Sequence, residues 1–453
     1  MRLSRTIFKS PARIAILGFA AVIFSGALLL MLPAASTAAP IGFINALFTA
    51  TSATCVTGLA VLDTGQALTR FGQVVVLALI QVGGLGIMTI STLLLLVAGK
   101  RPSMMGRVVI SDTLTHSGEH SVASLLKEVA LFTLVIESLG AIVMLTQFLP
   151  GRSKAEAVYL SVFHAVSAFC NAGFSTFSDS FMGFQENTVL NLVLCFLIIS
   201  GGIGFLVLSE IRHRFSFSRR LLKRFSLHSK LVLSTTAILL FVSTLLFVMM
   251  EWDNTLAPFA PLHKILVGFF HAVSARTAGF NSISIMDMSN EALFLIILLM
   301  IIGASPGSCG GGIKTTTFSC LTILGISRLF GHEKPHMFHR TISQESIGKA
   351  VSIVMISIFV IFSSTLLLLM SELGEISHPM SRGKFLELLF EVVSAFGTVG
   401  LSMGATAGLS AVGKLIITGV MFVGRLGPLM IALAVSRQEP IRYYFAEENI
   451  MIG

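Results

Sequence analysis

The sequence predicts an all-α membrane protein in which four similar units of a single chain surround a central axis. Three observations predict this fold class. The 453 residues are 54% hydrophobic and only 12% charged, which is more apolar surface than a water-soluble core can bury. A short phrase recurs four times along the chain. Basic residues gather in alternate connections between apolar segments, as in proteins that cross a membrane repeatedly.

Apolar stretches long enough to cross the hydrocarbon of a bilayer recur along the whole length, so residues 1–453 are predicted to form one membrane domain. Examples are 14–32, 74–98, 129–149 and 230–250. The first stretch follows several basic residues, as a secretory signal would. Its apolar core is longer than that of a typical signal, and the fourfold pattern needs it, so we expect it to be retained as a helix.

The positive charges are distributed unevenly between the connections. Apart from the N-terminus, the basic connections are 100–107, 212–230, 328–340 and 437–442. The connections between them are mainly acidic. Under the positive-inside rule this alternation places both termini in the cytoplasm and requires an even number of crossings. Because the basic residues are spread over several loops, the net charge of +9 does not indicate nucleic-acid binding.

The recurring phrase consists of a phenylalanine and, four residues later, a serine followed by alanine. Its serines are Ser52, Ser167, Ser274 and Ser394. A glycine follows each phrase within a cluster of small residues. The repetition divides the chain into predicted units 12–99, 128–212, 229–327 and 349–437, followed by a cytoplasmic tail, 438–453.

Each unit begins with a long apolar helix, and another long apolar helix follows the glycine. The segment between them, such as 43–54 or 385–396, is too short to cross the bilayer and must return on the side from which it entered. Non-helical backbone at that depth is tolerated only where it lines water or is buried in protein. The sequence therefore predicts eight transmembrane helices plus four re-entrant pore helices around a pseudo-fourfold pore.

The four glycine turns are suited to bind a monovalent cation. Glycine permits backbone angles that point successive carbonyl oxygens towards an axis, and four such strands make oxygen rings that replace an ion's water shell. The pore helices also aim their negative C-terminal ends at the axis. The predicted filter consists of Val56, Thr57, Gly58, Asn171, Ala172, Gly173, Thr277, Ala278, Gly279, Thr398, Val399 and Gly400.

With a glycine in every turn, these loops resemble the filter loops of the Trk/Ktr/HKT superfamily of potassium transporters, and the chain is most similar to the KtrB branch. The resemblance covers essentially the whole chain. It implies uptake of potassium across the bacterial plasma (inner) membrane by a homodimer with one pore per subunit. It also implies a cytoplasmic ring of nucleotide-binding RCK subunits of the KtrA type. Only the turn at 398–400 approaches the full potassium-channel signature, so weaker selectivity is expected.

The second helix of the third unit is interrupted by glycine, serine and proline between 303 and 314. Glycine costs about 1 kcal/mol and proline about 3 kcal/mol in a helix interior, so this run should unwind within the membrane. Discontinuous helices at that depth mark ion pathways. The resemblance implies that the run is a loop that gates the pore beneath the filter. The predicted gate comprises Ser305, Pro306, Gly307, Ser308, Gly310, Gly311, Gly312 and Lys314.

Arg425 is predicted to complete the gate. Aligning 83–86, 201–204, 311–314 and 424–427 places this arginine where the other units have a small residue. A charge at that depth is costly and functional by default. The resemblance favours a link to the gate loop; a purely structural pairing with loop carbonyls is the alternative. The third unit is expected to be the only one whose second helix is disrupted by such a run.

No catalytic constellation is found, so the chain is not expected to be an enzyme. The run 307–314 nearly matches a phosphate-binding loop, but Ile313 stands where that motif needs lysine. His164 and His271 each stand alone on a pore helix, and packing or a helix hydrogen bond is expected of them. The scattered cysteines are expected to be packing residues.

Potassium is the expected transported ion, sodium is an open candidate as an activator, and no cofactor is expected. The alternative to a gated pore is a coupled sodium/potassium symporter. A symporter would be expected to carry an ionisable side chain at the membrane centre in addition to Arg425, and no clear carboxylate is expected there.

Overall fold

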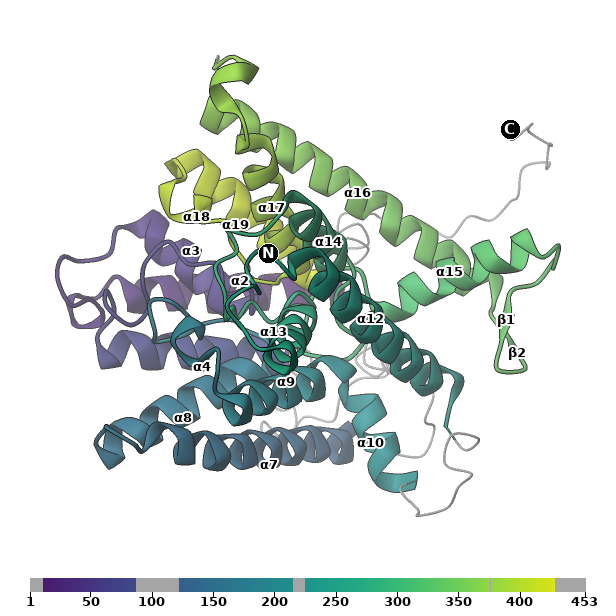
Figure 1. Cartoon of the computed structure of the whole chain (residues 1–453), viewed down its shortest axis with the longest axis horizontal. Helices are drawn as coiled ribbons and strands as arrows, with labels where there is room; N and C mark the ends of the chain where they lie inside the picture. The colour runs from purple at the N-terminus through teal and green to yellow at the C-terminus, as the bar shows by residue number, and fades with distance from the viewer. Residues whose placement is uncertain (1–10, 87–121, 215–224, 375, 428–453) are drawn as a thin grey trace, which may run out of the picture.

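The computed structural model describes residues 11–86, 122–214, 225–374 and 376–427, and they form a bundle of helices (Figure 1). The predictions for the basic connection 100–107, the unit ends at 99 and 437, and the tail 438–453 lie outside these residues. The described part of the first predicted unit contains α2 (Pro11–Leu30), the short turn η1 (Pro33–Ala35), α3 (Phe43–Thr54) and α4 (Arg70–Leu85).

The other units repeat this order with additions. The second contains α7 (Val122–Phe148), α8 (Lys154–Phe169), η2 (Met182–Phe184), α9 (Thr188–Ile203) and α10 (Phe205–Arg214). The third contains α12 (Leu227–Glu251), α13 (Pro261–Ser274), α14 (Asn290–Ile301) and α15 (Thr315–Leu329). The fourth contains α16 (Gln344–Leu373), η3 (His378–Ser381), α17 (Lys384–Gly397), α18 (Ala405–Gly408) and α19 (Ala411–Leu426). A hairpin of β1 (His336–Met337) and β2 (Arg340–Thr341) joins the third and fourth units and projects from the bundle (Figure 1).

The helix that follows each glycine turn begins in the same way in every unit. A polar side chain precedes its first residue and accepts the backbone N–H three positions later, at 3.0 to 3.3 Å. These N-caps are Thr69, Asn187, Ser289 and Ser410. Each cap satisfies one of the otherwise unpaired N–H groups of the first turn, so the polar residue defines where the helix starts.

The units are arranged in a closed circle. Within each unit the first long helix packs on the short helix that follows it. The helix after the glycine turn then contacts the short helix of the next unit: α4 contacts α8, α9 contacts α13, α14 contacts α17, and α19 contacts α3. The phenylalanines of the repeated phrase fill the interior, since Phe48, Phe163, Phe270 and Phe390 are all fully buried.

The long outer helices expose apolar side chains, as expected of surfaces that face lipid. Leu134 of α7 is 67% exposed, and Phe241 of α12 and Phe359 of α16 are each 72% exposed. Among the described residues, three helices are long and apolar enough to cross a membrane, Lys127–Phe148, Leu227–Glu251 and Gln344–Leu373. The pair α9 and α10 passes the same test only as one span bent by 98°. Arg70–Leu85 and Asn290–Ile301 are shorter apolar helices. The count of eight crossings remains a prediction.

Candidate functional site

The four short helices end in turns of the same backbone shape. In each turn a non-glycine residue with positive φ is followed, two positions later, by a glycine with positive φ, a region that glycine enters at no steric cost. The non-glycine residues are Val56, Asn171, Thr277 and Thr398, and their φ values are 50° to 69°. The glycines are Gly58, Gly173, Gly279 and Gly400, and their φ values are 69° to 96°.

The four turns meet in one ring. A Cβ built on Gly58 would lie 2.5 Å from the carbonyl oxygen of Ala172 and 3.0 Å from the Cα of Gly173. Gly173 has the same relation to the third turn, the third turn to the fourth, and the fourth back to the first. Side chains at these glycines would collide with the neighbouring backbone. The predicted filter residues of all four units are therefore brought together, and the ring closes on itself.

The repeated serines form hydrogen bonds with the turns. The hydroxyls of Ser52 and Ser394 accept the N–H groups of Gly58 and Gly400 at 3.1 and 3.0 Å. In the two middle units the serine hydroxyl donates instead, to the carbonyl of the phenylalanine that follows the glycine, from Ser167 to Phe174 at 2.7 Å and from Ser274 to Phe280. In every unit the serine of the phrase therefore forms a hydrogen bond with the backbone of its turn.

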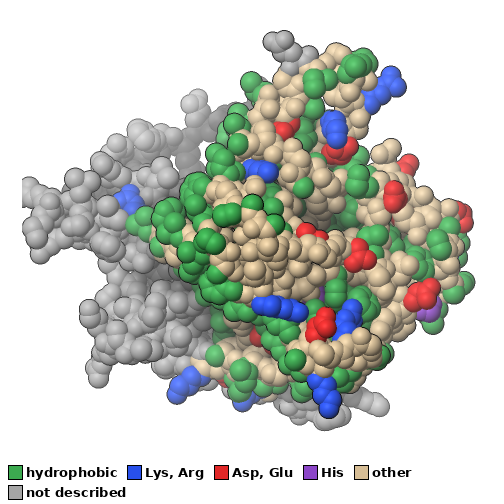
Figure 2. Space-filling view, turned by 90° about the vertical axis from the view of Figure 1, so that its left-hand side faces the viewer, with side chains coloured by type: hydrophobic (Ala, Val, Ile, Leu, Met, Phe, Trp, Pro, Cys, Tyr) green, Lys and Arg blue, Asp and Glu red, His purple; other side chains and the backbone are tan. Residues whose placement is uncertain are grey.

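A cavity of about 330 Å³ opens over the ring and is lined by all four glycines. Asp63, Asn281 and Ser402 are among the polar residues around it. The loop that carries Asp63 joins α3 to α4 at the left of Figure 1, and Figure 2 views this end of the molecule, where charged side chains of both signs reach the surface. The cavity gives the ring an entrance on this side.

The interrupted segment between α14 and α15 lies against the other side of the ring. The N–H of Gly311 donates to the hydroxyl of Thr398 at 2.9 Å, and a Cβ on Gly310 would collide with the Thr277 hydroxyl. The loop is also fastened to the end of α9, because Ser305 and Cys309 donate N–H bonds to the carbonyls of Gly202 and Gly201 at 3.0 and 3.1 Å. The predicted gate residues are therefore next to the predicted filter residues.

Polar side chains close the loop on itself. Ser308 donates its hydroxyl to the carbonyl of Ser305 at 2.6 Å, and Thr315 donates to the Ser305 hydroxyl at 3.0 Å. Lys314 donates to the carbonyl of Gly310. Gly307 and Gly312 both have positive φ, at 72° and 67°. The carbonyl of Gly307, next to Pro306, accepts the N–H of Phe205 at 3.0 Å, which ties the loop to the start of α10.

Arg425 connects this loop to two other units. One guanidinium nitrogen donates to the carbonyl of Cys309 on the loop, and the other donates to the carbonyl of Gly83 near the end of α4. Among the described residues, the acceptors of Arg425 are therefore backbone carbonyls, which fits both the predicted link to the gate loop and the purely structural alternative.

The alignment of the third unit with the others was wrong by several residues. Gly83, Gly201 and Gly424 all lie the same number of residues after the N-cap of their helix. In the third unit Gly303 lies at this position and Gly311 does not. The position of Arg425 is then occupied by Ala304 in the third unit. The inserted glycines had produced a second, misleading match, which only the helix start could resolve.

A break in the second helix is not confined to the third unit. The α9 helix ends at Ile203, and α10 continues at 98° to it after Gly204, whose φ is 99°. Helices α4 and α19 end at Leu85 and Leu426, each followed by a glycine with positive φ. Within the described residues, the break between α14 and α15 is longer than the single residue that separates α9 from α10.

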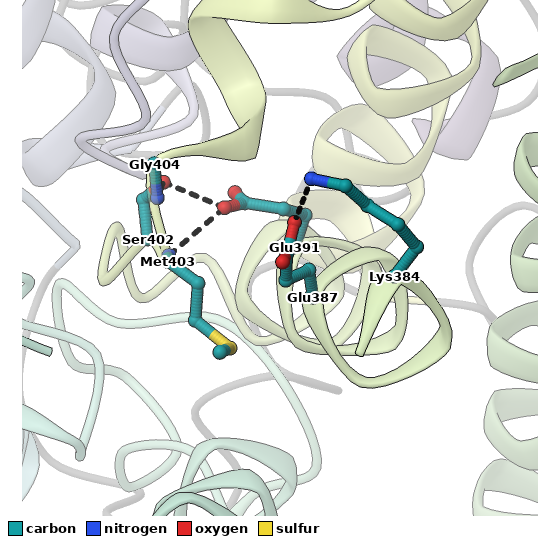
Figure 3. Close-up of polar contacts among 6 residues, drawn as sticks. All are labelled: Lys384, Glu387, Glu391, Ser402, Met403 and Gly404. Carbon is teal, nitrogen blue, oxygen red and sulfur yellow. Dashed lines mark hydrogen bonds and ion pairs between the residues drawn. The ribbon is translucent and has the colours of Figure 1, made fainter. Parts of the chain in front are cut away.

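A buried carboxylate on α17 was not anticipated, because no clear ionisable side chain other than Arg425 was expected at the membrane centre. Glu391 of α17 is fully buried. It accepts the hydroxyl of Ser402 at 2.6 Å and the N–H of Met403 at 3.0 Å, as Figure 3 shows, whereas the nearby Lys384 pairs with Glu387. The signal was available, because Glu391 occupies the position of the phrase that His164 and His271 occupy in other units.

A second missed carboxylate, Glu137, lies midway along α7 and accepts a hydrogen bond from Gln81 at 3.3 Å. The two histidines behave largely as expected. His164 bonds to the carbonyl of Leu160 on its own helix at 2.8 Å and stacks on Phe177, and His271 stacks on Phe247.

Comparisons with known proteins agree on one family. The family model TrkH, described as cation transport protein, matches residues 6–445. The chain is 40% identical over 446 residues to Ktr system potassium uptake protein B of Bacillus subtilis, covering 98% of this chain and 97% of that protein. It is 37% identical to the potassium/sodium uptake protein NtpJ of Enterococcus hirae, covering 98% and 97%. The crystal structure of the potassium transporter TrkH from Vibrio parahaemolyticus matches with a TM-score of 0.74 at 18% identity, covering 94% of this chain and 85% of that one.

Proposed function

The chain belongs to the TrkH family of cation transport proteins, and we propose that it takes up potassium through a gated, potassium-selective pore whose filter is the ring of four glycine turns. The proposed filter is formed by the twelve residues of the four turns, with potassium bound by backbone carbonyls. No catalytic role and no cofactor are part of this proposal.

The closed ring of glycines is the observation that carries the proposal. Each glycine packs against the carbonyl that precedes the next glycine, so four backbone strands surround one axis at close approach. Carbonyl oxygens in such rings replace the hydration shell of a monovalent cation. The cavity over the ring supplies an approach for ions from one side.

Uptake of rubidium or potassium into proteoliposomes containing the purified full-length chain tests this function. We expect uptake of rubidium or potassium that added sodium inhibits only weakly. Equal uptake of potassium and sodium, or none above protein-free vesicles, would contradict a potassium-selective pore.

The proposed gate is the segment from Ser305 to Lys314 together with Arg425. Its support is position, since the loop contacts Thr277 and Thr398 on the side of the ring opposite the cavity. Arg425 holds the loop through Cys309 and brings a positive charge close to the path of a cation. The loop would have to move for ions to pass.

A sodium/potassium symporter is the second candidate. One relative is named a potassium/sodium uptake protein, and Glu137 supplies a carboxylate within a membrane-spanning helix. Imposing a sodium gradient on potassium-loaded proteoliposomes separates the two candidates. Potassium accumulation that follows the sodium gradient would indicate coupling, whereas an effect of sodium without a gradient would indicate activation.

We further propose that the protein is a homodimer in the bacterial plasma membrane, has both termini in the cytoplasm and carries a cytoplasmic ring of RCK-type nucleotide-binding subunits. The similarity to membrane subunits named after a Ktr system supports a partner. The basic connection around the β1–β2 hairpin, with Arg328, Lys334 and Arg340, is a candidate contact. Purification with a candidate RCK protein at low salt tests it, and complete absence of binding would contradict it.

A further inference from the structure

Behind the ring, the strand that follows each filter glycine runs back past its own pore helix. The backbone N–H three residues beyond the glycine belongs to Val61, Thr176, Ser282 and Met403 in the four units. A buried N–H of this kind needs an acceptor, because an unmade hydrogen bond in a water-free interior is costly. In three units the acceptor is a side chain from one position of the pore helix.

The second unit uses a histidine as this acceptor. The Nδ1 of His164 lies 2.8 Å from the carbonyl of Leu160, which can only accept, so Nδ1 carries the proton. Nε2 is then an acceptor, and it receives the N–H of Thr176 at 3.3 Å and lies 3.1 Å from the Ser175 hydroxyl.

The third unit shares the contact to the strand, but the Nδ1 of His271 makes no hydrogen bond within the described residues. The Nε2 of His271 accepts the N–H of Ser282 at 3.4 Å and lies 3.4 Å from the hydroxyl of the same residue. Ser282 and His271 are both buried, so water does not compete for these groups.

The fourth unit replaces the imidazole by a carboxylate. Glu391 accepts the N–H of Met403 at 3.0 Å and the hydroxyl of Ser402 at 2.6 Å (Figure 3). Its second oxygen accepts the hydroxyl of Thr406. Ser402 in turn accepts the N–H of Gly404 at 2.9 Å, as Ser175 accepts the N–H of Phe177 at 3.0 Å. An imidazole and a carboxylate thus accept the corresponding backbone N–H at equivalent positions.

The first unit differs. Thr49 occupies the position, but its hydroxyl donates to the carbonyl of Asn45 on its own helix at 2.8 Å. Within the described residues, no hydrogen bond links this side chain to the strand around Val61. Three filter strands are held from behind by a pore-helix side chain, and the first is not.

We propose that His164, His271 and Glu391 are positioning residues that determine ion preference by accepting the backbone N–H three residues beyond the filter glycine of their own unit. This inference rests on the proposed function, because the glycine ring must be the filter. The property that matters is acceptance of a hydrogen bond at that position, and neither negative charge nor aromatic stacking is required.

The test compares paired variants of the full-length chain in proteoliposomes. Glu391→Gln retains an oxygen for Met403, and Thr406 can donate or accept as its new partner requires, so the ratio of potassium to sodium uptake should remain within about twofold of wild type. Glu391→Ala removes the acceptor, and the ratio should fall about tenfold, since leaving a buried donor unpaired has a large effect. The ratio does not depend on how much protein folds.

The histidines supply a second pair in case the glutamate variants fold poorly. His271→Gln keeps an acceptor close to the position of Nε2 and should preserve the ratio. His271→Phe keeps the stacking on Phe247, whose ring centroid lies 5.5 Å away, but lacks an acceptor and should lower the ratio. Thr49→Val is the matched control at the first unit and should leave the ratio unchanged.

Three results would overturn the inference. Loss of selectivity in Glu391→Gln equal to that in Glu391→Ala would assign the effect to charge. Unchanged selectivity in His271→Phe would reduce the histidine to packing. Unchanged selectivity in both Glu391→Ala and His271→Phe, while Gly58→Ser shifts the ratio, would reject the anchors and leave the filter assignment standing. If the glycine variant also has no effect, the proposed filter itself is wrong.

Discussion

The glycine ring and the loop beneath it are held in place by different kinds of interaction. The ring is made of four equivalent parts, and each part is fixed by steric contact with the next. Within the described residues a loop of this length occurs in the third unit only, and it is fixed by hydrogen bonds to α9, to Thr398 at the end of α17 and to Arg425 of α19. Steric closure tolerates almost no change, whereas hydrogen bonds to backbone carbonyls can be exchanged for others. We therefore expect that changes in the ring alter ion preference and that changes in the loop alter opening.

The largest expected effect is on the ring. Gly58→Ser places a side chain 2.5 Å from the carbonyl of Ala172 at a φ of 93°, so the turn must shift. We expect the preference for potassium over sodium to fall at least about tenfold in competition uptake assays. Gly151→Ala is the control, since its φ is 78° but nothing lies within 4 Å of its Cβ. A wild-type ratio in Gly58→Ser would end the assignment of the ring as a filter.

Shortening the loop should be the next largest change and should affect the other property. Removing part of 305–312 deletes the contacts to Thr398 and Arg425 while leaving the ring intact. We expect uptake without any partner to rise about tenfold at an unchanged potassium-to-sodium ratio. A matched deletion at Phe338 and His339, in the hairpin outside the bundle, should leave uptake unchanged. A well-folded loop deletion with wild-type uptake would contradict the gate.

Arg425→Ala should act in the same direction but less strongly. It removes the donors to Cys309 and Gly83 and leaves the other contacts of the loop in place. Basal uptake should rise about threefold, because only part of the energy holding the loop is lost. Arg425→Lys keeps the charge without the two-pronged guanidinium and should be intermediate. A changed ion ratio with unchanged basal uptake would place Arg425 in the filter instead.

Thr315→Val should give the smallest effect. The substitution preserves shape and removes one hydrogen bond, that from Thr315 to the Ser305 hydroxyl at 3.0 Å. We expect a loss of about 1 kcal/mol in stability and a change of less than about twofold in basal uptake. Thermal unfolding in detergent and the uptake assay measure the two quantities. A large increase in uptake would show that this bond alone holds the loop.

The short helices were the most predictable elements. The segment predicted at 43–54 is the helix Phe43–Thr54, and that predicted at 385–396 lies within Lys384–Gly397. Repetition made this possible, since each of the four copies of the phrase predicts the same short helix. The glycines of the turns were found for the same reason, because a required positive φ leaves glycine at the same place in every copy.

Repetition also misled. The extra glycines of the third unit were aligned with Gly83 and Gly201, although the N-cap Ser289 shows that Gly303 is their partner. The second helix predicted to continue to residue 98 was given no break, although α4 ends before Gly86. The equivalence of Glu391 with the histidines was not recognised because the residue types differ, although both side chains accept hydrogen bonds.

The sequence by itself determined the membrane class, the four short helices and the positions of the turn glycines, because hydropathy, length and backbone freedom are local properties. Tertiary structure alone decided that the turns close into one ring, that the loop lies against Thr277 and Thr398, and that Arg425 joins the loop to α4. These contacts connect residues from different units, and which carbonyl meets which donor depends on how the helices pack around the axis.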